Sequence, residues 1–270
     1  MKKTILIVAG VFSLNTFGYA QEGYNPLSVR PVHTSDVMYQ KTITRAIDLR
    51  EKQNQSLYAR NNEITALIIN AVQNGVIKAY ANDSLNRQLT IESFNKKMES
   101  PTVASISTDT VDLFLEHGEN WKEITDLMKE EKYMARDFYQ LEIKEEVLFN
   151  KQKSQVVYDI QTITIFIPAD HPYNTKGLQE AVATFSYKEL AEKLFKDNPK
   201  AIWYNVENDK ESKNLADAFD LRLFSSYIIK VSNAKDLYLT DMYADPKQSQ
   251  MASLWAAHEL MEKEHNLWEF

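Results

Sequence analysis

The sequence predicts an α+β fold, in which a single domain combines a mixed, mostly antiparallel sheet with packed helices. Helix-like and strand-like segments do not alternate regularly, as they would in a doubly wound parallel sheet. The two strand-like segments nearest the C-terminus, residues 223–231 and 237–243, are close in sequence, which favours an antiparallel pair. The chain has no cysteine, so the fold must depend on its hydrophobic core, for which roughly 250 residues suffice.

The first 20 residues, 1–20, have the pattern of a secretory signal peptide. Two lysines follow the initial methionine, an apolar run comes next, and small residues precede a predicted cleavage between Ala20 and Gln21. A membrane anchor is the alternative, but the run is interrupted by Ser13 and Asn15 and is shorter than the about 20 apolar residues that cross a bilayer. No cysteine is available for lipid attachment. We expect an exported chain without a direct membrane span.

Residues 21–40 predict an extended N-terminal arm that precedes the α+β domain at 41–270. The segment contains Pro26 and Pro31 and shows no hydrophobic periodicity. Such a segment is usually a flexible terminus, although in an oligomer it can lie across a neighbouring subunit.

Two helices are predicted in segments that flank the middle of the chain. Residues 42–54 begin with Ile43, Ala46 and Ile47 on one helical face. Residues 133–151 predict a long helix that leads directly into the next strand.

Residues 61–75 give a clearer helical signal. An asparagine at 61 or 62 caps the segment, and Gly75 ends it. The predicted buried stripe consists of Ile64, Leu67, Ile68, Ala71 and Val72. A short strand follows at 76–80, and residues 100–131 contain a strand-like and a helix-like piece.

Residues 156–167 predict a central strand. The segment is rich in β-branched residues and ends at Pro168. Its apolar positions change parity near 159–162, which indicates a β-bulge.

The remaining elements follow from capping and turn signals. Ser186 and Glu189 form a capping-box pattern at the start of a helix, and Asp245-Pro246 begins a C-terminal helix. The predicted ranges are helices at 187–196 and 212–219, a strand at 202–206, and the strand pair at 223–231 and 237–243.

Composition excludes several function classes. The net charge of −7 becomes −9 when the two leader lysines are removed, and no basic cluster is present, which argues against nucleic acid as a partner. The glycines are isolated from one another, so no nucleotide-binding glycine loop can form. No G-x-S-x-G serine elbow occurs. We expect no cofactor.

The C-terminal helix carries the best candidate for a metal site. His258, Glu262 and His265 lie at i, i+4 and i+7, a spacing that can hold zinc through two imidazoles and a carboxylate. The zincin pattern, however, has a second His where this chain has Glu262. Alternatively, His258 is a packing residue on the apolar stripe of Met251, Leu254, Trp255 and Met261. A periplasmic metal-dependent hydrolase is therefore the alternative function.

Other candidate sites have simpler explanations. Asp170 and His171 after the central strand can act as an acid–base pair, but two prolines within five residues favour a rigid turn. Tyrosines can form a carbohydrate-binding or peptide-binding surface, although core packing is the commoner use; they include Tyr158, Tyr187, Tyr204, Tyr227, Tyr238 and Tyr243. The apolar residues that end the chain must dock on their own domain or on a partner.

Several blocks taken together resemble the GldN/PorN family over roughly Lys41 to the C-terminus. They are residues 49–54, 142–159, 167–168, 184–190, 198–199, 203–205, 217–219, 221–224 and 266–269. The chain stops almost at the last block, so any C-terminal extension of relatives is missing and its contacts are in doubt.

The resemblance implies a non-enzymatic structural subunit of the type IX secretion and gliding motility apparatus. Such a subunit lies in the periplasm, at the inner face of the outer membrane, and self-associates in a ring complex with a GldK/PorK-like outer-membrane lipoprotein. It also contacts the periplasmic part of a GldM/PorM-like motor protein. No catalytic residues are implied. We expect partner contacts at the arm and at Arg50, Glu51, Lys52, Leu267, Trp268 and Phe270.

Overall fold

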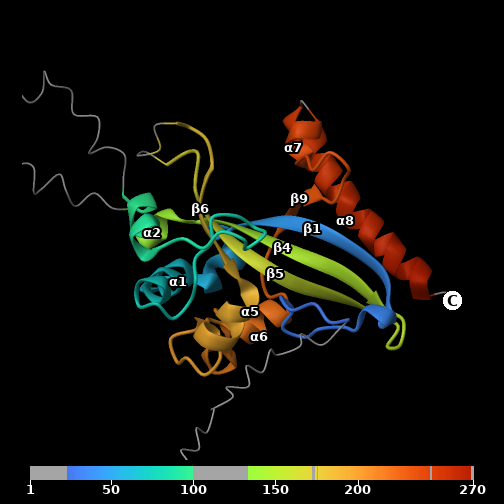
Figure 1. The fold of residues 1–270 in the computed structure, drawn as a ribbon, viewed down its shortest axis with the longest axis horizontal. Helices are drawn as coiled ribbons and strands as arrows, with labels where there is room; N and C mark the ends of the chain where they lie inside the picture. Colours follow the sequence, from blue (N-terminus) through green and yellow to red (C-terminus); the bar gives the residue numbers. More distant parts are fainter. Residues whose placement is uncertain (1–22, 100–132, 172–173, 175, 244, 269–270) are drawn as a thin grey trace, which may run out of the picture.

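A computed structural model describes residues 23–99, 133–171, 174, 176–243 and 245–268. The predicted leader with Ala20 and Gln21, the two pieces within 100–131, and Phe270 lie outside the described residues. The described part forms an α+β fold around one five-stranded sheet in the order β6-β5-β4-β1-β9 (Figure 1). Every strand pair within this sheet is antiparallel, as the sequence predicts for most of them.

The elements have the following bounds. The sheet contains β1 Val37–Asp48, β4 Gln140–Asn150, β5 Gln155–Ile167, β6 Glu180–Ser186 and β9 Tyr227–Val231. Two small antiparallel pairs join β2 Tyr58–Ala59 to β3 Asn62–Glu63, and β7 Ile202–Trp203 to β8 Lys213–Asn214. The α-helices are α1 Ile64–Gln73, α2 Ile91–Lys97, α5 Tyr187–Glu189, α6 Leu215–Asp220, α7 Leu239–Met242 and α8 Pro246–Trp268, and a π-helical turn Leu190–Phe195 continues α5. Short 3-10 turns occur at Thr34–Asp36, Lys52–Leu57, Ala135–Asp137 and Asp209–Glu211.

The two helices predicted at 42–54 and 133–151 are wrong, since these segments contain β1 and β4, the paired strands in the middle of the sheet. Both errors have one physical cause. Arg45 and Glu145 interrupt the alternation of apolar residues, because they lie on the core face of their strands and pair with each other there. The local preference of these segments for helix is outweighed by this long-range pairing, as is common for strands.

The central strand and its bulge are confirmed. β5 pairs with β4 so that Lys144 lies opposite Thr162 and Glu145 lies opposite Ile160. Gln161 is therefore the extra residue, within the predicted range of 159–162. The bulge brings Ile160 and Ile163 onto the same buried face.

The helices at α1, α5, α6 and α8 are confirmed, although the capping box is not, since the Ser186 side chain makes no capping hydrogen bond. The strand predicted at 237–243 is wrong. Asn233 donates to the carbonyl oxygens of Val231 and Leu237, which turns the chain after β9 into helix α7. The strand predicted at 76–80 is reduced to bridges at Tyr80.

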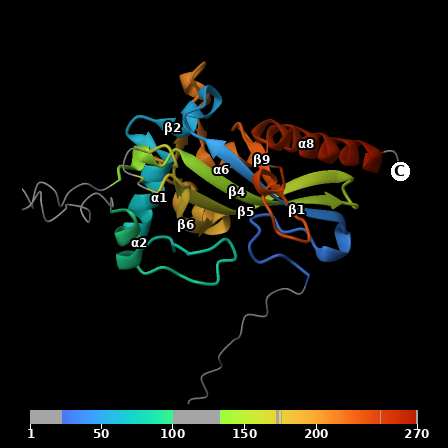
Figure 2. The ribbon, with the colours of Figure 1, turned by 90° about the horizontal axis from the view of Figure 1, so that it is seen from above.

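The core face of the sheet is covered by different helices at its two ends (Figures 1 and 2). At one end, α1, the α5 segment and α6 enclose the larger cluster, which we call the main core. At the other end, α8 covers a smaller cluster, the α8 core, formed by Ile43, Val147, Ile228, Leu239 and Leu260.

A buried ion triad lies between the two cores. The fully buried carboxylate of Glu145 accepts from Arg45 Nε at 2.5 Å and from Arg222 Nη1 at 2.7 Å. The Arg222 guanidinium also lies 4.5 Å from the centre of the Tyr158 ring. Both carboxylate oxygens are thus occupied by charged donors, as a buried carboxylate requires.

Candidate interaction surfaces

Helix α8 presents small residues to the sheet and large ones to solvent. Ala252, Ala256, Ala257 and Leu260 pack toward the α8 core. The helix is further held by Glu259, whose Oε1 lies 3.8 Å from Lys41 Nζ on β1. The side of α8 that faces the sheet therefore holds the helix in place although its side chains bury little apolar area.

The outward side of α8 carries four exposed large apolar side chains. Met251, Leu254, Trp255 and Met261, which we call the α8 stripe, are between 54% and 75% exposed. They recur at helical spacing, so they share one face. The sequence predicted this stripe but associated it with packing; the structure turns it to solvent.

A groove continues the α8 stripe toward the start of β9. It has a volume of about 610 Å³ and lies beside Leu254. Its apolar walls come from Tyr227, Tyr243 and Pro246. Contiguous exposed apolar surface of this kind marks protein interaction sites.

A second cavity lies between β5 and the N-terminal arm. Residues 23–34, which we call the arm loop, close on themselves where the Thr34 amide donates to the Gly23 carbonyl at 2.8 Å. Gly23 has φ +90°, and a Cβ there would lie 2.6 Å from the His33 ring, so only glycine fits. The cavity beneath this loop, the arm groove, has a volume of about 600 Å³.

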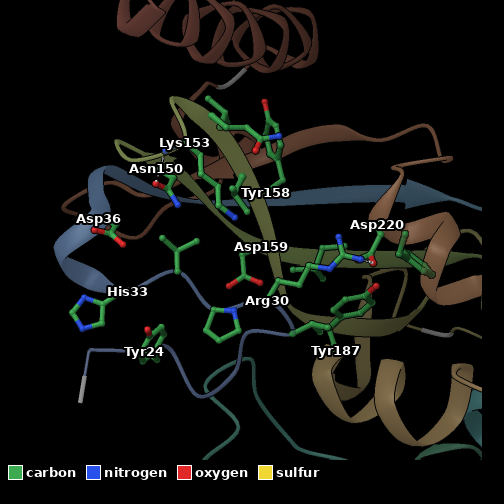
Figure 3. A pocket seen from close by; sticks show the side chains of 18 of the residues that line it. Tyr24, Arg30, His33, Asp36, Asn150, Lys153, Tyr158, Asp159, Tyr187 and Asp220 are labelled. Atoms are coloured by element: carbon green, nitrogen blue, oxygen red, sulfur yellow. Dashed lines mark hydrogen bonds and ion pairs between the residues drawn. The ribbon is translucent and has the colours of Figure 1, made fainter. Parts of the chain in front are cut away.

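The floor of the arm groove is polar. In Figure 3, Asp159 points from β5 toward the arm loop, and Arg30 reaches from the loop to Asp220, with 2.7 Å between Nη2 and Oδ2. Burial raises the pKa of Asp159 to about 6, although a hydrogen bond from Gln161 Nε2 at 2.6 Å opposes the shift. Burial also raises the pKa of Tyr187, which lines the same cavity.

Comparison with known proteins identifies the family. The family described as gliding motility associated protein GldN matches residues 32–269, which is nearly the whole chain. The chain belongs to the GldN family. No curated protein matches it. The match includes β5 and α8, whereas residues 23–31 of the arm loop precede it. This GldN-family chain is a component of the gliding motility and type IX secretion apparatus, and its family is not known as an enzyme family.

The predicted contact residues Arg50, Glu51 and Lys52 of this GldN-family chain follow β1. All three are exposed. Arg50 is engaged within the chain, since its guanidinium lies 3.6 Å from the centre of the Tyr139 ring and 2.9 Å from Asp48 Oδ2. Glu51 and Lys52 remain the residues of this block that are more accessible to a partner.

The predicted terminal contacts are only partly described. Leu267 is half-buried in the last turn of α8. Trp268 ends the helix, and its side chain, like the whole of Phe270, lies outside the described structure. The proposed roles of these three residues stay predictions.

The predicted metal ligands do not converge. His258 Nδ1 lies 3.5 Å from Glu262 Oε1, and both side chains point to solvent, 70% and 64% exposed. In the described part of the chain, no three metal-ligating side chains lie close enough to hold a metal ion. The helical spacing places the two side chains on one face, but nothing else in the described structure completes a coordination sphere.

The side chains of Asp170 and His171, predicted as a possible acid–base pair, contact different residues in the structure. Asp170 Oδ1 accepts from the Tyr139 hydroxyl, which lowers the pKa of Asp170. His171 Nε2 lies 3.4 Å from Asp137 Oδ1, and its ring packs edge-on against Tyr133. These contacts fit the turn interpretation.

Among the predicted tyrosines, Tyr187 is buried, whereas Tyr204, Tyr227, Tyr238 and Tyr243 are more than a third exposed. Among the described helices, none is long and apolar enough to span a bilayer.

Proposed function

We propose that this GldN-family chain is a non-enzymatic structural subunit in the periplasm. It associates with the inner face of the outer membrane through a GldK/PorK-like lipoprotein, forms a ring complex with it, and contacts a GldM/PorM-like motor protein. The observation that carries this proposal is the α8 stripe, which leaves four large apolar side chains in water.

Exposure on this scale favours a partner. Each large apolar side chain contributes about 1.5–3 kcal/mol when it is fully buried, so covering the α8 stripe yields several kcal/mol toward association. Trp255 in particular has the size and the exposure that interface hot spots show. A ring requires that this surface meet a different surface on the next subunit or on the lipoprotein, because head-to-tail contacts close rings.

The test is assembly with the partner lipoprotein. We would purify the protein and the GldK-like lipoprotein of the same genome without its lipid, and measure their masses by size-exclusion chromatography with light scattering, separately and mixed. A large assembly that forms only in the mixture is the expected result. Independent monomers at every concentration would overturn the ring proposal.

The α8 stripe is tested by the double variant Leu254→Ser/Trp255→Ser. Because both side chains already face solvent, we expect the free energy of unfolding to change by less than about 0.5 kcal/mol. The midpoint concentration for assembly should rise by about tenfold or more. The matched control is Val206→Ser, since Val206 is 76% exposed but lies outside α8. Equal assembly by the two variants would remove the α8 stripe from the interface.

A further inference from the structure

The outer edge of β5 is open along half of its length. β6 pairs with β5 only from Thr162 to Ile167 and ends opposite Thr162 at Ser186. Along Gln155–Ile160, no described residue forms a backbone hydrogen bond to the outer edge; Gln161 Nε2 approaches the Asp159 carbonyl at 3.5 Å. An unpaired strand edge of this kind is a template for another strand.

The arm loop passes this edge without pairing to it. Side chains hold the loop at three places: Asn25 Nδ2 donates to Glu146 Oε2 and to Gln161 Oε1, both at 3.2 Å, Arg30 pairs with Asp220, and Lys188 Nζ donates to the Pro26 carbonyl. The arm groove separates the loop from Gln155–Ile160, and all six of these residues line the groove. Its volume of about 600 Å³ is within the range of roughly 300–1,000 Å³ typical of binding pockets.

The groove contains two buried polar side chains with unused hydrogen-bonding capacity. Asp159 is 7% exposed and Tyr187 is 3% exposed, and the Tyr187 hydroxyl has no hydrogen-bond partner among the described residues. Asp159 accepts from the neutral amide of Gln161, and the buried Ser28 hydroxyl of the arm loop also lowers its pKa. Its strand neighbour across the pair is another acid, Glu146.

The nearby cations are already engaged. Arg30 pairs with Asp220, Arg222 binds Glu145, and Lys188 Nζ donates to the Pro26 carbonyl at 3.0 Å. A fourth cation, Lys153, also lines the groove, but it is exposed to solvent. A buried carboxylate and a buried hydroxyl that face one cavity therefore call for a donor from outside, and a positive charge complements Asp159 best.

We propose that the arm groove receives an extended segment of a partner protein, which adds as a strand to Gln155–Ile160. A lysine or arginine side chain of that segment enters the groove and donates to the Asp159 carboxylate and the Tyr187 hydroxyl. Main-chain hydrogen bonds supply affinity in such strand addition, and the side-chain pocket supplies specificity. The six edge residues span about 20 Å at roughly 3.3 Å per residue. This surface is separate from the α8 stripe, so either proposal can fail without the other.

The probe is a fluorescent peptide of about nine residues in which threonine and valine alternate around a central lysine. Its matched controls carry glutamate or norleucine at the centre. Fluorescence anisotropy with the purified protein should show the lysine peptide binding at least about tenfold more tightly than either control, because a hydrogen bond to a charged group is involved. Equal binding of the three peptides, or no binding of any, would overturn the proposal.

Protein variants locate the site. Asp159→Asn keeps the shape and should remove the preference for lysine, whereas Tyr187→Phe removes only the hydroxyl and should weaken lysine-peptide binding several-fold. Circular dichroism checks that each variant is folded. If Asp159→Asn does not fold, the binding of the lysine peptide to Tyr187→Phe serves as the test. A preference for lysine that persists in the folded variants would refute the site.

N-methylation of the peptide tests strand addition. Methyl groups on one set of alternate backbone nitrogens should abolish binding, and methyl groups on the other set should be tolerated, because only one side of an added strand faces the edge. Equal effects of the two sets would exclude strand addition. If instead the lysine peptide dissociates a dimer of this chain, a second copy is the occupant and the partner assignment is wrong.

Discussion

The two ends of the core face differ in what they bury and in what they expose. Five phenylalanines are fully buried in the described part of the chain, and all of them lie in the main core: Phe94, Phe138, Phe185, Phe195 and Phe219. The α8 core contains no phenylalanine or tryptophan, and its covering helix turns Trp255 to solvent instead. One end of the sheet therefore supplies most of the buried aromatic packing, whereas the other end is thinly covered and suited to being completed by a partner.

The largest expected effect contrasts a core residue from each end. Phe185→Ala should lower the free energy of unfolding by about 3–5 kcal/mol, because it opens a cavity in the main core. Leu260→Ala should cost about 2 kcal/mol, since Leu260 lies at the edge of the α8 core with 9% of its surface exposed. Urea denaturation of both variants measures the contrast. A loss at Leu260 that matches the loss at Phe185 would contradict the division into a strong and a weak end.

The ion triad between the two cores should be nearly as important. Glu145→Gln leaves Arg45 and Arg222 without their shared carboxylate and should lower the free energy of unfolding by about 3–5 kcal/mol. Asp83→Asn is the control, since Asp83 also pairs with a cation on β4 (Lys144 Nζ at 2.9 Å) but is exposed. We expect a change of about 0–1 kcal/mol for the control. Equal values for the two variants would mean that burial of the triad does not set its importance.

The smallest expected effect is a stabilisation on the opposite, polar face of the sheet. Burial raises the pKa of Glu142 to about 7. The negative charge of Asp83 adds to this increase, whereas the positive charge of Lys230 opposes it. The folded state therefore binds a proton more readily than the unfolded state, and stability falls as the pH rises from about 4.5 to about 7. Glu142→Gln should be more stable than the wild type by about 1–2 kcal/mol at pH 8 and nearly equal to it at pH 5.

Urea denaturation across this pH range measures the effect, with the exposed Glu207→Gln as control. Part of the pH dependence should remain in Glu142→Gln, because the pKa of Asp159 is also raised, to about 6. Its surroundings include Glu146, which raises that pKa, and Lys188, which lowers it. A variant that is less stable than the wild type at pH 8 would show that ionised Glu142 is favourable where it lies.

The helices and strands that are determined by neighbouring residues in the sequence were predictable. Helix α1 follows from its apolar stripe and Gly75, α8 begins at Pro246, and β5 follows from its β-branched residues, including the bulge at Gln161. The strands β1 and β4 were not predictable, because each has a charged residue on its core face. Arg45 and Glu145 can be buried there because they form an ion pair with each other, and a local sequence pattern does not reveal this pairing. The arm groove was also hidden, since it joins residues near 30, 159 and 187 that only the fold brings together.

The amino-acid sequence is sufficient to identify the family, the fold class and the helical spacing of Met251, Leu254, Trp255 and Met261. The tertiary structure alone decided which way this stripe faces. Both sides of α8 carry apolar residues, so periodicity cannot choose between them. Small alanines allow the helix to lie close against β9 and β1, and the bulky side is left outside.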